Sequence, residues 1–147
     1  MLKKILYLTL ILLFLMTTLV QAADLTAAIS ISPETIDLGT ISTGKIVEQF
    51  FVIKNEGDSD LVLTAITVDC PCSAFAYLKS DGDYQPYQPG NDIVISAGTS
   101  LSFKLIFNPE LTKYRGQFKK YILISSNDPQ IPIYKIALTG EIVSETN

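Results

Sequence analysis

Cys70 and Cys72, separated only by Pro71, are the residues of this chain best suited to redox or soft-metal chemistry. Such a pair can close a local disulfide, exchange with another thiol, or bind Cu(I) through two thiolates. In a strand, residues i and i+2 face the same side with Cα atoms about 6.6 Å apart, close to the upper limit for an unstrained disulfide. Three alternatives follow: a chemically inert pair, an exchange-active pair, and a thiolate clip for a metal.

The rest of the composition excludes most catalytic chemistry. The chain has no histidine, so Ser-His-Asp and Cys-His catalysis and histidine-based zinc or copper sites are ruled out. It also lacks a Gly-x-Ser-x-Gly nucleophile motif, a phosphate-binding glycine loop and a dinucleotide fingerprint. We therefore expect a protein that is not an enzyme and that needs no cofactor.

A second candidate site is the direct repeat of Tyr-Gln-Pro over residues 84–89. A polyproline II helix has three residues per turn, so it would place Tyr84 and Tyr87 on the same edge. This arrangement predicts an aromatic ledge that binds a peptide or a glycan. The favoured interpretation is instead a stiff loop that folds both tyrosines onto the domain.

The N-terminal 22 residues have the pattern of a secretory signal peptide. Lys3 and Lys4 precede an apolar run over residues 5–20, and Ala22 offers a small residue for cleavage. The run is shorter than the roughly 20 residues that span a bilayer. We expect cleavage after Ala22 and a periplasmic or secreted protein with no membrane span. Loss of the two lysines changes the net charge from −4 to −6, which argues against nucleic acid as a partner.

The remaining residues, 23–147, are predicted to form one all-β domain. Short β-branched and aromatic runs alternate with turn residues, and no segment shows helical periodicity. Strands are expected at residues 25–32, 34–41, 45–55, 61–69, 93–109, 116–126 and 131–143, and residues 73–92 are expected to be irregular. The pattern predicts an immunoglobulin-like, two-sheet antiparallel β-sandwich of seven or eight strands.

One predicted strand carries apolar residues on both faces. Phe50 and Val52 lie opposite Phe51 and Ile53. The favoured interpretation is a central strand covered by loops, because large exposed apolar patches are uncommon in monomers. The alternative is a surface that docks a partner or adds a strand.

Four motifs in order resemble a bacterial family of secreted domains of unknown function. They are "IDLGTISTGKIVEQFFVIKNEGDSDLVL", "DCPCS", "ISAGTSLSFKLIFNP" and "SNDPQIPIYKIALTGEI", and they extend from Ile36 to Val143. That family is related to ASH (Hydin-type) and major-sperm-protein-like domains, which share a PapD-like immunoglobulin sandwich. Two departures are Pro71, where the family usually has glycine, and a longer segment at residues 73–92. The resemblance implies a fold and an extracytoplasmic setting but no reaction.

These observations together predict a non-catalytic binding or structural module whose partner is another protein or a peptide. Binding would use an exposed strand edge or the region of residues 70–90, with Tyr84 and Tyr87 as candidate contacts. The alternative is a Cu(I) carrier or redox partner that uses Cys70 and Cys72.

Overall fold

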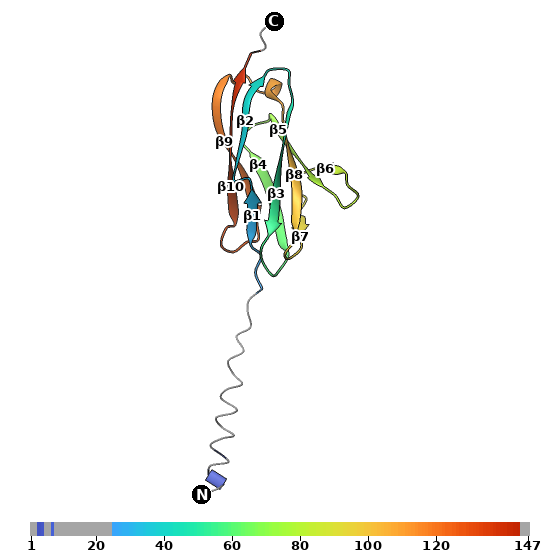
Figure 1. Ribbon diagram of the computed structural model, residues 1–147, viewed down its shortest axis with the longest axis vertical. Helices are drawn as coiled ribbons and strands as arrows, with labels where there is room; N and C mark the ends of the chain where they lie inside the picture. The colour runs from blue at the N-terminus through green and yellow to red at the C-terminus, as the bar shows by residue number, and fades with distance from the viewer. Residues whose placement is uncertain (1–2, 5–6, 8–24, 145–147) are drawn as a thin grey trace.

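The computed structural model describes residues 3–4, 7 and 25–144, so most of the expected signal peptide lies outside the described residues. No helix in this part of the chain is long and apolar enough to cross a membrane. Ten strands form two five-stranded sheets packed face to face (Figure 1). The strands are β1 (Ile29–Ser32), β2 (Thr35–Ser42), β3 (Val47–Asn55), β4 (Leu61–Val68), β5 (Ser73–Leu78), β6 (Tyr84–Pro86), β7 (Ile93–Ile95), β8 (Ser100–Phe107), β9 (Gly116–Ser126) and β10 (Ile133–Val143), and a short 3₁₀ helix spans Pro109–Leu111.

The first sheet has the strand order β1-β3-β8-β5-β6 and the second has the order β2-β10-β9-β4-β7. Their inner faces supply the core through alternation along each strand. Phe51 and Phe103 are fully buried and stack with ring centroids 5.4 Å apart, and Ile122 and Ile124 face them from the second sheet. Burying each such side chain contributes about 1.5–3 kcal/mol. The predicted all-β, immunoglobulin-like sandwich is confirmed.

The expected number of seven or eight strands is wrong. Residues 73–92 contain β5 and the three-residue strand β6, which were expected to be irregular. Residues 93–109 are two strands, because a turn at residues 96–99 carries the chain from β7 in the second sheet to β8 in the first. In this turn Gly98 has a φ of 69°, and the Thr99 amide and hydroxyl both donate to the Ser96 carbonyl.

The expectation that both sheets are purely antiparallel is also wrong, because the N-terminal strands divide between the two sheets. β1 pairs with β3 antiparallel in the first sheet. After only two intervening residues, β2 pairs with β10 in the second sheet, and this pairing is parallel. A bulge interrupts it at Gly39, whose φ is 62° and whose amide donates to Asp37 Oδ1 at 3.0 Å. Such a kink protects the free edge of β2 from pairing with another chain.

Asp128, in the turn between β9 and β10, ties the second sheet to the first. The residue is only 3% exposed. Oδ2 accepts a hydrogen bond from the Ile29 amide at 2.8 Å, and Oδ1 accepts from the Gln130 and Ile131 amides at 2.7 and 3.0 Å. Burial alone raises the pKa of this carboxyl, but the three amide donors outweigh burial and lower the pKa below its ordinary value of 3.8.

Asn55 at the end of β3 is the second buried polar link. Its side-chain amide donates to the carbonyls of Ser59 and Ile95 at 2.7 and 3.0 Å. Its Oδ1 accepts from the amides of Gly57 and Ala28 at 3.0 and 3.3 Å. One side chain therefore holds the segment before β1, the β3–β4 turn and β7 together, with all of its polar atoms paired.

We predict that Asp128→Asn lowers the free energy of unfolding at neutral pH by about 2–3 kcal/mol, because the amide group turns one acceptor into a donor facing a backbone N–H. The carboxylate's folded-state pKa is depressed, so its contribution is complete at neutral pH and is lost as pH falls below 3.8 through the folded value. Urea unfolding followed by circular dichroism between pH 7 and pH 3 should show a steeper loss in the wild type than in the variant. Parallel curves would contradict this role.

Candidate functional site

The two cysteines lie in the turn between β4 and β5, where the chain crosses from the second sheet to the first. They form a disulfide with their Cα atoms 5.1 Å apart. The strand spacing of about 6.6 Å that was expected for them is therefore wrong, because the chain has left the extended conformation. The turn is closed by the Cys70 amide, which donates to the Val68 carbonyl at 2.8 Å, and the Cys72 carbonyl accepts from the Asn108 amide at 2.7 Å.

Both cysteines belong to the hydrophobic core, with 8% of Cys70 and 2% of Cys72 exposed. Thiol–disulfide exchange needs an attacking thiolate to reach one of the sulfurs, so this burial opposes exchange in the folded state. A disulfide also offers no thiolate to Cu(I). The structure does not show a metal-carrying role for the pair, and the described residues contain no group of three His, Cys, Asp or Glu side chains placed to hold a metal.

Tyr87 links the two sheets at the place where β7 ends. Strand β7 pairs with β4 only over residues 61–63, so the Ile66 amide lies beyond the end of β7. The Tyr87 hydroxyl accepts a hydrogen bond from this amide at 3.2 Å, while the Tyr87 amide donates to the Phe75 carbonyl in the first sheet at 2.9 Å. Its ring packs against the core. Tyr87 thus joins the sheets, which matches the interpretation of a loop folded onto the domain.

Tyr84 lies on the outer face of the first sheet, where it stands opposite Leu78 in the β5–β6 pairing. Its ring centroid is 5.8 Å from that of Phe50, with 55° between the ring planes. Lys104 places its Nζ 4.9 Å from the centroid of the Tyr84 ring. The prediction that Tyr84 and Tyr87 share one edge is wrong, because Tyr84 contacts Phe50 and Lys104 on the outer face, whereas Tyr87, just after β6 ends at Pro86, packs its ring against the core.

We use the name aromatic patch for Phe50, Val52, Tyr84 and Lys104 on this outer face. Phe50 is 51% exposed and Val52 is 37% exposed, so the favoured interpretation that loops cover this strand is wrong. Lys104 is opposite Phe50 in the β3–β8 register, and its Nζ lies 3.2 Å from both carboxylate oxygens of Glu48. The patch therefore combines exposed apolar surface with a cation that is held in place from two sides.

Sequence reasoning identified Phe50, Val52 and Tyr84 separately but missed that Phe50 and Tyr84 touch, and it missed Lys104. The only signal for Lys104 was its alternation with buried Phe103 and Leu105, which places it on the outer face. The contact itself depends on how β3, β8, β5 and β6 align.

We predict that dithiothreitol reduces the Cys70–Cys72 disulfide slowly in the native protein, because both sulfurs are buried. Reduction should accelerate as urea promotes opening of the fold. Quenching with an alkylating agent and measuring the mass shift follows the rate, with guanidinium-unfolded protein as the control. A native rate equal to that of the unfolded chain would contradict the buried position.

Structural comparisons agree with this architecture. A structure of a protein of unknown function from Porphyromonas gingivalis W83 has a TM-score of 0.64 and 22% identity over 83% of this chain and 50% of that one. The chain thus spans half the length of that protein. The seventh PapD-like (ASH) domain of human CEP192 has a TM-score of 0.57 and 13% identity, covering 86% and 93% of the two chains. The YadV chaperone has a TM-score of 0.51 and 14% identity, covering 78% and 51%.

At these identities the structural likeness shows the fold alone, and no curated protein matches the sequence. The family DUF1573, described as a protein of unknown function, matches residues 29–142. This range contains nearly the whole sandwich, from the start of β1 to the penultimate residue of β10. The resemblance noted from the four motifs is confirmed: the chain belongs to the DUF1573 family and has a PapD-like, ASH-related immunoglobulin fold.

Proposed function

We propose that this protein is a non-catalytic, extracytoplasmic binding module whose aromatic patch docks another protein or a peptide. The observation that carries the proposal is that Phe50, half exposed, stands in ring contact with Tyr84 on an open sheet face. Aromatic residues dominate the energetics of protein interfaces because each buries 150–250 Å² of surface. A partner side chain packed over Phe50, Val52 and Tyr84 would remove this apolar area from water.

The geometry of the patch favours binding because its members are already ordered. Lys104 is held by the Glu48 carboxylate and by the face of the Tyr84 ring, so little side-chain entropy remains to be lost on association. Val52 pairs with Ser102 of β8, which gives the apolar centre a polar neighbour. An apolar centre with a polar rim is the usual anatomy of a protein interface.

Several features support the other parts of the proposal. A chain without histidine lacks the commonest proton shuttle, and its disulfide is buried. The signal-like N-terminal sequence and the disulfide both suit an oxidising compartment outside the cytoplasm. YadV, which shares the fold, is a chaperone, a class of protein that works by binding another chain. The burial of Cys70 and Cys72 makes the thiol-based alternative the weaker one.

The test is site-specific photocrosslinking in the native host. A benzophenone amino acid at position 50 should yield a discrete crosslinked protein product, whereas the same probe at position 94 should not. Val94 is a matched control because it is an exposed valine on a strand of the second sheet. Adding Val52→Asp should reduce the product from position 50 at least roughly fivefold, because it places a charge in the apolar centre.

The corresponding control substitution is Val94→Asp, which should leave the product from position 50 unchanged. Thermal unfolding of both variants establishes that each still folds. No specific product at position 50, or equal loss of product in the two aspartate variants, would show that the aromatic patch is not the docking surface.

A further inference from the structure

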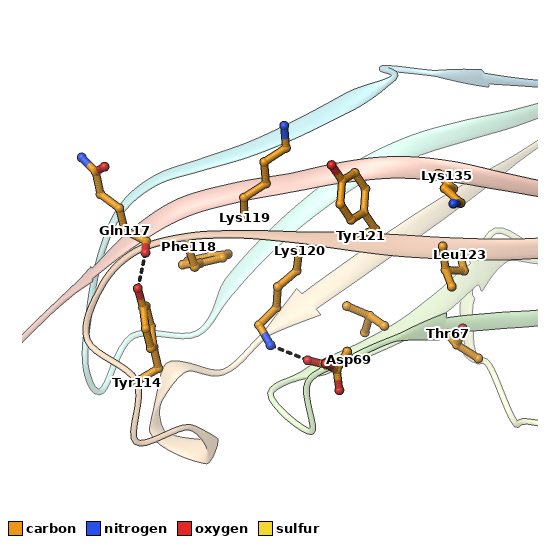
Figure 2. A pocket seen from close by; sticks show the side chains of 11 residues that line it. Thr67, Asp69, Tyr114, Gln117, Phe118, Lys119, Lys120, Tyr121, Leu123 and Lys135 are labelled. Atoms are coloured by element: carbon orange, nitrogen blue, oxygen red, sulfur yellow. Dashed lines mark hydrogen bonds between the residues drawn. The ribbon is translucent and has the colours of Figure 1, made fainter.

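A groove of about 1110 Å³ lies on the second sheet (Figure 2), whereas the aromatic patch lies on the first. It runs along β9 and is bordered by the end of β4 and by the loop before β9. The residues that matter for its chemistry are Lys119, Lys120, Tyr121, Leu123 and Lys135, together with Tyr114 from the loop.

The strand pattern explains how cations and apolar groups share this groove. Ile122 and Ile124 point into the core, so Lys119, Tyr121 and Leu123 point outward. Lys135 of β10 is directly opposite Leu123 in the register and therefore shares its face. The result is an apolar floor at Leu123 and Tyr121 with an amine on each side.

Three contacts order the groove without neutralising its charge. The Lys120 amine donates to the Asp69 backbone carbonyl, and the Tyr114 hydroxyl donates to the Gln117 carbonyl. The Lys119 amine lies 5.8 Å from the centroid of the Tyr121 ring. The partners of these cations are a carbonyl dipole and a ring face, and neither is a carboxylate. Asp69 is the one acidic residue of the lining, against Lys119, Lys120 and Lys135, so the lining keeps a net charge of +2 (3 − 1) that is available to a ligand.

The charge distribution along the chain is strongly uneven around this groove. Residues 113–135 hold five of the eleven Lys and Arg residues but only one of the fifteen acidic residues, Asp128. That residue is buried, and its carboxylate accepts hydrogen bonds from three backbone amides. The rest of the chain has six cationic and fourteen acidic residues. A locally positive surface on an acidic protein attracts an anionic group to one place.

We propose that this groove binds an acidic segment of a partner protein. The carboxylates of that segment would pair with Lys119 and Lys135, and an apolar side chain between them would pack on Leu123 and the Tyr121 ring. The apolar floor favours a peptide over a glycan, which has no apolar side chain to bury there. A nucleic acid has a dense, continuous charge that would extend beyond the groove over the acidic remainder of the chain, so the net charge of −4 opposes it more than it opposes a short acidic segment confined to the groove.

The proposal does not depend on the aromatic patch, because the two surfaces belong to different sheets. A library of random dodecapeptides displayed on phage is selected against the secreted protein expressed from its full-length sequence. We expect enriched peptides in which several Asp or Glu residues surround an apolar residue. Their affinity should fall as salt rises from 50 to 300 mM, because exposed charge pairs are screened.

A matched pair of variants locates the binding. Lys119→Ala/Lys135→Ala should lower the affinity for a synthetic copy of the enriched peptide at least roughly fivefold, as expected for the loss of two partly exposed charge pairs. Lys45→Ala/Lys79→Ala removes the same charge from exposed sites elsewhere and should change affinity less than twofold. Thermal unfolding verifies that both variants fold.

Four results would overturn the proposal. Two concern the peptides: no enrichment of acidic sequences, or equal weakening of binding in the two double variants. The third is tighter groove-dependent binding of a heparin hexasaccharide or a single-stranded DNA 12-mer, and the fourth is peptide binding that only Val52→Asp abolishes. The last result would contradict the groove while supporting the aromatic patch, so the two proposals can fail separately.

Discussion

The carboxylate of Asp128 holds the sandwich closed, because it fixes the first strand of one sheet to a turn of the other. The Ile29 amide of β1 would otherwise lack this buried partner, and the β9–β10 turn would lose the acceptor for two of its own amides. Asn55 adds a second link close by, where it joins the segment before β1 to β7. Both side chains are buried and fully paired, so each is costly to remove and each specifies one arrangement of the sheets.

The fold was largely predictable from alternation of apolar and polar residues. The segments 116–126 and 45–55 coincide with β9 and nearly with β3, because long strands with one buried face leave a clear period of two. Strands β6 and β7 have three residues each, which is too few to show a period. The position of Cys70 was not predictable, because its closeness to Cys72 depends on a turn between sheets that local sequence does not define.

The candidate binding surfaces were predictable only in part, for a related reason. The apolar side chains of Phe50 and Val52 on the second face of a strand were a visible signal. Whether loops cover these side chains or leave them exposed could be decided only from the positions of the neighbouring strands. The contact of Phe50 with Tyr84 joins residues 34 positions apart through three aligned strand pairs. The lysines of the groove entered the sequence argument only as part of a net charge, although Lys119, Tyr121 and Leu123 alternate visibly.

The parallel pairing of β2 with β10 has a consequence for the order in which the parts of the chain fold. Thr35 and its partner Ala137 are 102 positions apart, and β10 lies between β2 and β9 in the second sheet. A ribosome, which releases the N-terminus first, therefore leaves β2 without its neighbour until residues 137–143 have emerged. Closure of the second sheet must be a late, whole-chain event, governed by long-range contacts.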